Sequence, residues 1–304
     1  MKHASLAAAL LTLSACATAP DLAEAPQMAA CRPAGYDRAQ LDALKAAGWT
    51  VADDAQRNAL ALALAECVGD PDPTVRDGIA YEGLQAWMRQ RTLTNETLAA
   101  LNANLQAKLT APDASGFQRP FAALVLSEVT RTDRVQAWLT AEQRAQLVDA
   151  SVAYLEGVRD YRGYDEREGW RHGTAHAADL MLQLVLNPNV DRAQLERIRG
   201  AIASQVAPNG HFYIYGESER LARPILYMAQ RNEFTEAEWT AWFTQLAGDE
   251  ASWSGNWYAT NAGLARKHNL SAFASVIYTN VDISGEAAFA PLLPGANAMI
   301  RALP

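Results

Sequence analysis

Residues 169–189 read GWRHGTAHAADLMLQLVLNPN, a pattern typical of a long buried helix. At about 100° per residue, His172, His176 and Asp179 fall within one narrow sector of that helix, and Gln183 extends the sector. Leucine, valine and methionine side chains cover most of the remaining circumference. A helix of this kind is expected to face a cavity or cleft along its hydrophilic stripe. The stretch therefore predicts a candidate site without defining its chemistry.

Helix signals recur along the rest of the chain. Four capping boxes, in which an N-cap oxygen is followed three residues later by Gln or Glu, open helix-length segments. They are Asp37 with Gln40, Thr140 with Gln143, Asp191 with Gln194, and Thr235 with Glu238. Period-two alternation is weak except at residues 211–215, where a short extended piece is expected. The sequence thus predicts an all-α fold of roughly ten to twelve helices joined by short turns.

These helices are expected to stack as antiparallel pairs, because each one must bury an apolar stripe against its neighbours. Stacking gives either a curved HEAT-like α-solenoid or a closed α/α toroid, and the solenoid is favoured. No linker within residues 36–304 is long enough to force a boundary, and 50% of the whole chain is hydrophobic. Residues 36–304 are therefore predicted to form a single domain with a sizeable core.

The N-terminal region predicts export and anchoring. A cationic start and a short apolar run lead to Leu13-Ser14-Ala15-Cys16, which resembles the lipobox of a bacterial lipoprotein signal. The run is shorter than the about 20 residues that span a bilayer, so residues 1–15 are expected to be a removable signal. The alternative is an ordinary secretory signal with an incidental cysteine. Residues 16–35, rich in Ala and Pro, would then form a tether.

The lipobox resemblance implies that Cys16 is lipidated and that the membrane is a partner. Several acyl chains anchor stably, since each buried methylene adds about 0.8 kcal/mol. Ala17, and not Asp, follows the cysteine. By analogy with Gram-negative lipoproteins, this implies the outer membrane, with the body of the protein facing the periplasm.

Cys31 and Cys67 are the cysteines that remain after the expected cleavage. An exported protein enters an oxidising compartment, where a disulfide between them would tie the start of the fold to a later helix. Such a bond would contribute about 2–4 kcal/mol. Two separate thiols, with Cys67 buried on an Ala- and Leu-rich helix, are the alternative.

The charge balance argues against nucleic acid as a partner. The net charge is −8 at pH 7, and no basic stripe is visible in the sequence. The chain also carries no nucleophile elbow, phosphate loop, dinucleotide fingerprint or paired-cysteine metal motif. These absences do not decide whether the protein is an enzyme.

Four motifs, in order, resemble the DUF2785 family of bacterial proteins. They are RDGIAYEGL at 76–84, RPFAAL at 119–124, DYRGY at 160–164 leading into GWRHGTAHAAD at 169–179, and GESERLA at 216–222. The resemblance spans about residues 55–245. It implies an all-helical body, but neither an established substrate nor established catalytic residues.

The histidine stripe admits two interpretations. His172 and His176, spaced at i and i+4, can share a divalent metal such as zinc, with Asp179 as third ligand or as acceptor for His176. Gly173 stands where zincin-type helices carry the general-base glutamate, so a base would come from elsewhere. The favoured alternative is an internal hydrogen-bond network, because buried polar groups must be paired. Its expected members are Arg162, Tyr164 and Arg223.

A second set of residues carries charge. Arg76 with Asp77, Arg119, Arg220 and Arg223 either line a concave face that binds carboxylate or phosphate, or form intramolecular ion pairs. Ion pairs are favoured. The candidate binding residues are therefore Arg76, Asp77, Arg119, Arg162, Tyr164, Trp170, His172, His176, Asp179, His211, Glu219, Arg220 and Arg223.

Three functions remain open from the sequence. The best supported is a lipid-anchored helical scaffold whose concave side holds a peptide, a glycan or an envelope protein. The second is a metal-dependent hydrolase centred on His172, His176 and Asp179. The third is a glycan-active toroid that uses Glu217 and Glu219, near His211, as acid and base.

Overall fold

The structure, a computed structural model, describes residues 31–33, 35–253, 255 and 257–304. The predicted signal and most of the predicted tether, including Cys16, lie outside the described residues. Nearly all regular structure is helical, which confirms the all-α prediction. In the part of the chain that is described, no helix is both long and apolar enough to cross a membrane.

Helices follow one another along the N-terminal half. In order they are α1 (Arg38–Ala46), α2 (Asp54–Leu64), η1 (Ala65–Cys67), α3 (Pro73–Val75), η2 (Arg76–Tyr81), α4 (Glu82–Gln90), α5 (Asn95–Thr110), α6 (Gln118–Val135) and α7 (Ala141–Gly157). The C-terminal half adds β1 (Tyr164–Asp165), β2 (Gly169–Trp170), α8 (Gly173–Val185), α9 (Arg192–Val206), α10 (Glu217–Ala229), α11 (Glu236–Ala247), η3 (Glu250–Trp253), η4 (Trp257–Ala259), α12 (Asn261–Ser284), η5 (Ala287–Leu292) and α13 (Leu293–Ala302).

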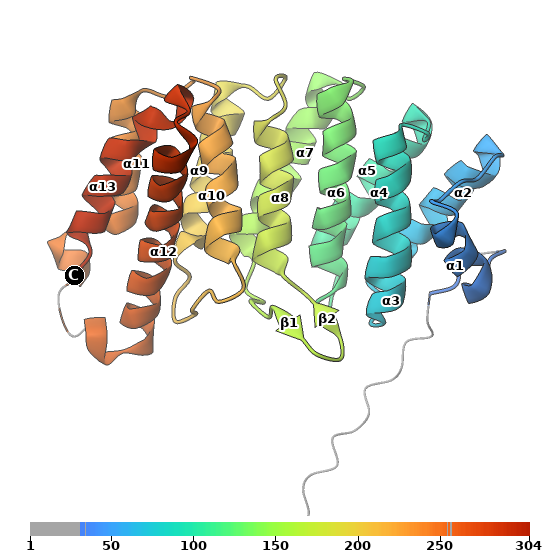
Figure 1. Cartoon of the computed structure of the whole chain (residues 1–304), viewed down its shortest axis with the longest axis horizontal. Coiled ribbons are helices and arrows are strands. Elements are labelled where there is room, and N and C mark those ends of the chain that lie inside the picture. Colours follow the sequence, from blue (N-terminus) through green and yellow to red (C-terminus); the bar gives the residue numbers. More distant parts are fainter. Residues whose placement is uncertain (1–30, 34, 254, 256) are drawn as a thin grey trace, which may run out of the picture.

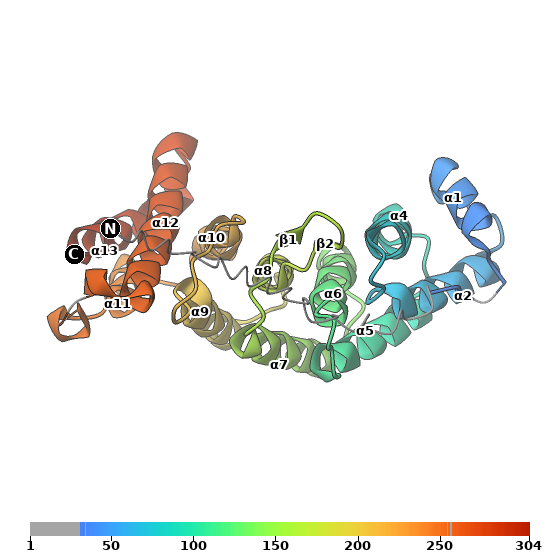
Figure 2. The same ribbon diagram turned by 90° about the horizontal axis from the view of Figure 1, so that it is seen from below.

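The helices form two layers of an open arc (Figure 2). Helices α4, α6, α8 and α10 line the concave side, while α2, α5, α7 and α9 form the convex layer. Packing follows this order, since α6 contacts α5 and α8, and α10 contacts α8 and α9. Helices α1 and α13 lie at opposite ends of the row in Figures 1 and 2. The described chain is therefore not a closed ring, and the toroid alternative is wrong.

Local sequence signals account for the helix starts. All four predicted capping boxes are present, at the beginnings of α1, α7, α9 and α11. In each, the N-cap oxygen accepts from the N3 amide while the N3 side chain accepts from the N-cap amide. Two otherwise unpaired backbone donors are satisfied in this way, which fixes where the helix begins.

The core lies between the two layers. Leu105 of α5, Phe121 and Val125 of α6, Leu147 of α7 and Leu184 of α8 are all buried. Each belongs to the apolar stripe of its own helix, so stacking removes every stripe from water at once.

A disulfide joins Cys31 to Cys67, with their Cα atoms 5.3 Å apart. The backbone amide of Cys31 also donates to Asp70 Oδ2 at 2.5 Å. These two links hold the start of the described chain against the end of η1. The structure therefore contains the disulfide and not two separate thiols.

One local expectation is wrong. The helix with the histidine stripe begins at Gly173, because Gly169–Trp170 pair as a strand with Tyr164–Asp165. Residues 211–215 lie outside both helices and strands, so the expected extended piece pairs with no neighbouring strand. A side chain takes the place of a neighbouring strand there: Asn269 of α12 accepts from the amide of residue 213 and donates to the carbonyl of residue 211.

Candidate functional site

The β1–β2 hairpin projects from one edge of the arc, beside the N-terminal ends of α8 and α10 (Figure 1). Four aromatic side chains gather there, and we call them the hairpin site: Tyr164, Trp170, His172 and Tyr215. The Trp170 and His172 rings stack, with centroids 4.5 Å apart and an interplanar angle of 21°. The Tyr164 ring centroid lies 5.0 Å from that of Trp170, and Tyr215 meets Trp170 edge-on at 5.8 Å.

Two of these rings face solvent. Tyr164 is 49% exposed and Trp170 is 37% exposed, which is high for side chains of this size. Gly163 permits the arrangement, because a Cβ at that position would overlap the Tyr215 ring. The hairpin therefore presents an aromatic surface that packs against the protein on one side only.

His172 supports this surface from behind. It is the N-cap of α8, in the left-handed region at φ 56°, and its Nε2 lies 3.1 Å from the Tyr215 carbonyl oxygen. Since a carbonyl only accepts, Nε2 carries the proton and donates. Burial, and then the positive charge of Arg220, lower the pKa of His172 to about 4. The imidazole is therefore neutral at neutral pH, and its ring face is free to stack on Trp170.

His176 lies one turn deeper. It is buried, and its ring meets Phe121 edge-on at 5.1 Å and His172 at 5.8 Å. Burial, followed by repulsion from His172 and Arg220, holds the pKa of His176 well below its usual range. The two histidines thus form a neutral pair.

Asp179 forms an ion pair with Arg220. Arg220 Nε donates to Asp179 Oδ1 at 2.9 Å, and Arg220 Nη2 pairs with Asp179 Oδ2. Within the described ranges, no three His, Cys, Asp or Glu side chains are placed to hold a metal ion. The predicted metal site at His172, His176 and Asp179 is therefore wrong. The expected geometry required His172 to be inside the helix, whereas it is a cap whose Nε2 donates to a carbonyl.

A chain of polar contacts crosses the concave side. Arg89 of α4 pairs with Glu128 of α6 at 2.5 Å, and Arg134 of α6 donates to Gln183 of α8 at 3.1 Å. The Asp179–Arg220 pair continues the series from α8 to α10. Each contact links successive helices of the concave layer. Asp179 and Gln183 of the predicted stripe take part in these contacts, but Arg162, Tyr164 and Arg223 do not bond to the imidazoles, and His176 Nδ1 has no partner among the described residues.

The remaining predicted arginines are also paired. Arg76 is fully buried; it donates to the Glu168 carbonyl of the hairpin at 2.8 Å and pairs with Asp77 at the same distance. Its guanidinium lies over the Phe117 ring, 4.0 Å from the centroid. Arg76 therefore fixes the hairpin to η2, and it is not accessible to a ligand.

Two further predictions lie apart from the hairpin. Arg119 donates to the Ala111 carbonyl at 2.7 Å, which closes the turn between α5 and α6. Glu219 and Arg223 form an exposed i,i+4 pair on α10 at 2.8 Å. For these residues the ion-pair or structural interpretation holds.

An open pocket of about 550 Å³ adjoins the hairpin site. Arg162, Tyr164 and His211 line it together with Tyr215. Arg162 Nε donates to Asp160 Oδ1 at 2.8 Å, and this pair is half exposed.

His211 stacks on Tyr161, with ring centroids 4.8 Å apart. Burial lowers its pKa, although Glu217 opposes the shift. His211 and Arg162 thus meet at an accessible pocket, whereas His172, His176 and Asp179 are not among its lining residues.

Neither Tyr215 nor Glu128 is predicted from the sequence as part of the site. Tyr215 lies 43 residues from His172, and Glu128 lies 39 residues from Arg89. The only signal for Tyr215 was its place in the alternating segment 211–215. Contacts over such separations leave no local pattern.

The fold and the site define an all-α protein with an aromatic surface site beside an open pocket. Residues 101–279, more than half of the chain, match the family described as "Protein of unknown function (DUF2785)". The chain therefore belongs to the DUF2785 family. The match begins after the motif at 76–84 and extends beyond residue 245, so it is shifted relative to the expected span. No curated protein and no solved structure matches the chain.

The pH dependence of stability tests the neutral state of His172. Its folded pKa of about 4 lies below the ordinary value of 6.5. The unfolded chain therefore takes up the proton first, so stability present above pH 6.5 is lost as the pH falls towards 4. His172→Asn keeps an amide donor and tolerates positive φ, but it does not titrate. We expect urea unfolding at neutral pH and at about pH 4.5 to show a smaller loss for the variant. Equal losses would contradict the assignment.

Proposed function

We propose that this protein is a lipid-anchored binding protein of the bacterial cell envelope that recognises a glycan at the hairpin site. The observation that carries the proposal is the exposed face of Tyr164 and Trp170 beside an open pocket of hydrogen-bonding side chains. The open arc of helices is, in this proposal, a HEAT-like α-solenoid that serves as the scaffold.

The chemistry of the site suits a sugar. An aromatic ring offers a flat apolar surface to the C–H face of a pyranose, and polar groups beside it fix the orientation. Here the Arg162–Asp160 pair and His211 supply donors and acceptors at the edge of the aromatic surface. The pocket of about 550 Å³ is of the size that holds one or two sugar rings.

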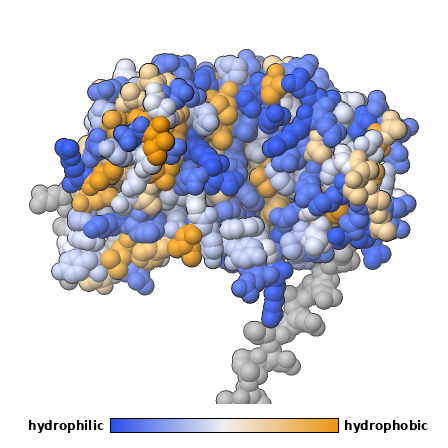
Figure 3. Space-filling model, viewed as in Figure 1, coloured by the Kyte–Doolittle hydropathy of each residue, from blue (hydrophilic) through white to orange (hydrophobic). Residues whose placement is uncertain are grey.

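The surrounding surface favours a hydrated ligand over an apolar protein partner. Figure 3, which shows the concave side, is mainly hydrophilic over the middle of the row, and larger apolar patches lie toward the C-terminal end. The core of a protein interface is normally depleted in charged groups. A glycan, which brings its own hydroxyl groups, fits the hairpin edge better.

We propose that the protein binds this glycan, and we assign no catalytic role to Glu217 and Glu219. Glu219 is exposed and paired with Arg223, while Glu217 is buried and accepts from the Tyr215 amide at 2.9 Å. The two carboxylates therefore differ in surroundings and do not face one enclosed cavity, as an acid and base pair would require.

Anchoring through Cys16 places the site near the membrane. Residues 16–30 would span at most about 50 Å when fully extended, and the described chain begins at Cys31. We propose that the outer membrane holds the anchor and that the hairpin site faces the periplasm, within reach of peptidoglycan.

Replacing Cys16 tests the anchor. Cys16→Ser removes the thiol that carries the lipid, so we expect the protein to move from the membrane fraction to the soluble fraction. Ser14→Ala is the matched control, because it keeps the cysteine and should leave the protein in the membrane fraction. Retention of the Cys16→Ser variant in membranes would contradict the proposed anchor.

Replacing Trp170 tests the binding function. We expect the full-length protein to bind soluble peptidoglycan fragments saturably, and Trp170→Ala to weaken binding about tenfold, since an aromatic stack contributes about 1.4 kcal/mol. Tyr258→Ala removes another exposed ring, on η4, and should bind like the wild type. Isothermal titration calorimetry measures all three. No binding by the wild type, or equal affinity of Trp170→Ala and wild type, would overturn the proposal.

A further inference from the structure

A second pocket lies at the edge of the arc opposite the hairpin, between the α4–α5 turn and the C-terminal end of α6. Its volume is about 230 Å³. We call it the arginine pocket, lined by Arg91, Asn95, Arg131, Gln136 and Trp138 among others. No sequence motif indicated it, and its residues take no part in the hairpin site.

Two positive charges in this pocket are unpaired. Among the residues that the structure describes, the guanidinium groups of Arg91 and Arg131 have no hydrogen-bond or ion-pair partner, and no carboxylate lines the pocket. Their neighbours behave differently, since Arg89 pairs with Glu128 and Arg134 donates to Gln183. In a chain of net charge −8, two free guanidinium groups at one pocket create a local positive potential.

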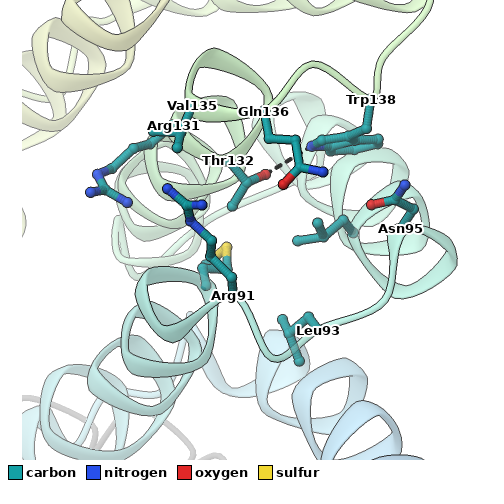
Figure 4. Close-up of a pocket in the computed structure, with 10 residues that line it drawn as sticks. Arg91, Leu93, Asn95, Arg131, Thr132, Val135, Gln136 and Trp138 are labelled. Atoms are coloured by element: carbon teal, nitrogen blue, oxygen red, sulfur yellow. Dashed lines mark hydrogen bonds between the residues drawn. The ribbon is translucent and has the colours of Figure 1, made fainter.

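Both arginines belong to one wall of the pocket. Figure 4 shows Arg91 and Arg131 extending on the same side of the pocket, with Asn95 and Trp138 on the opposite side. Trp138 Nε1 donates to Thr132 Oγ1 at 2.9 Å, which holds the indole ring as a fixed wall. Within the described part of the chain, the side-chain amide of Asn95 also has no partner, so it adds a neutral donor.

The backbone of Arg91 offers a way to remove its side chain without strain. Arg91 is the C-cap of α4 in the left-handed region, at φ 59°. This helix-terminal conformation favours glycine, and a residue with a Cβ is strained there. Glycine fits this position, so Arg91→Gly removes the guanidinium group without disturbing the cap.

We propose that the arginine pocket binds a small oxyanion, a carboxylate or a phosphate, between the guanidinium groups of Arg91 and Arg131. Guanidinium forks bind both anions through paired hydrogen bonds. The volume, below the usual range for drug-sized ligands, limits the ligand to a small molecule or a terminal group.

Calorimetric titration of the full-length protein with inorganic phosphate and, separately, with acetate tests the proposal and distinguishes the two anions. We expect saturable binding of at least one of them. Arg131→Gln and Arg91→Gly should each weaken it tenfold or more, whereas Arg301→Gln, at an exposed arginine of α13, should not change it.

Thermal unfolding separates binding from folding. Arg91→Gly relieves the left-handed strain, so its melting temperature should equal or exceed that of the wild type even though it has lost the anion. Failure of both anions to bind the wild type saturably, or unchanged affinity in Arg91→Gly and Arg131→Gln, would overturn the proposal.

Discussion

Replacing Asp133 by alanine is expected to lower the free energy of unfolding by about 3–5 kcal/mol. Asp133 is fully buried and accepts from Arg144 Nε at 2.9 Å and from Asn187 Nδ2 at 2.7 Å. It also accepts from the amides of Trp138 and Leu139, at 3.0 and 2.9 Å. The substitution leaves the buried charge of Arg144, the side-chain amide of Asn187 and two backbone amides without this acceptor, which is why the loss is large.

Urea unfolding measures this loss, and a surface ion pair provides the control. Asp149 pairs with Arg197, and about half of each side chain is exposed. Asp149→Ala should therefore cost less than about 1 kcal/mol. A loss for Asp133→Ala no larger than that for Asp149→Ala would show that the buried cluster does not support the fold.

Reduction of the Cys31–Cys67 disulfide is expected to lower the free energy of unfolding by about 2–4 kcal/mol. The bond joins residues 36 positions apart and restricts the unfolded chain, and it also keeps the Cys31 amide on Asp70. The loss should appear as a lower urea midpoint when a reductant is added to the wild type.

A double variant, Cys31→Ser with Cys67→Ser, controls for other effects of the reductant. Its urea midpoint should match that of the reduced wild type and should not respond to reductant. A wild-type midpoint that is the same with and without reductant would contradict the prediction.

The helices could be predicted because their signals are local. A capping box such as Thr140 with Gln143 satisfies its own helix terminus whatever the rest of the chain does. Apolar periodicity then requires neighbouring helices, which is enough for an all-α stack. The direction and openness of the arc depend on many small packing angles, so the sequence left the toroid as an alternative.

The hairpin site was harder to predict from the sequence, because its contacts join residues that are far apart in the chain. The helical wheel placed His172 on the face of His176, but the amide of His172 donates to the Arg162 carbonyl at 3.1 Å and that of Arg171 to the Gly163 carbonyl at 2.9 Å. These bonds extend the hairpin and make His172 a left-handed cap. Strands of two residues carry no periodicity signal, so the change from helix to hairpin could not be seen.

The role of Asp179 could not be predicted from the sequence for a similar reason. Asp179 is a plausible metal ligand until Arg220, 41 residues away, pairs with it. The free guanidinium groups of Arg91 and Arg131 show the converse case, since only the structure tells paired arginines from unpaired ones. Partner choice among charged side chains is a tertiary property.

Hydrogen exchange of the full-length protein, with and without soluble peptidoglycan fragments, tests most directly whether the hairpin site binds the ligand. We expect slower exchange of backbone amides in residues 163–172 and 211–216 when the fragments are present, and no change in α13. Unchanged exchange in both segments at saturating fragment, or protection confined to other helices, would contradict this expectation.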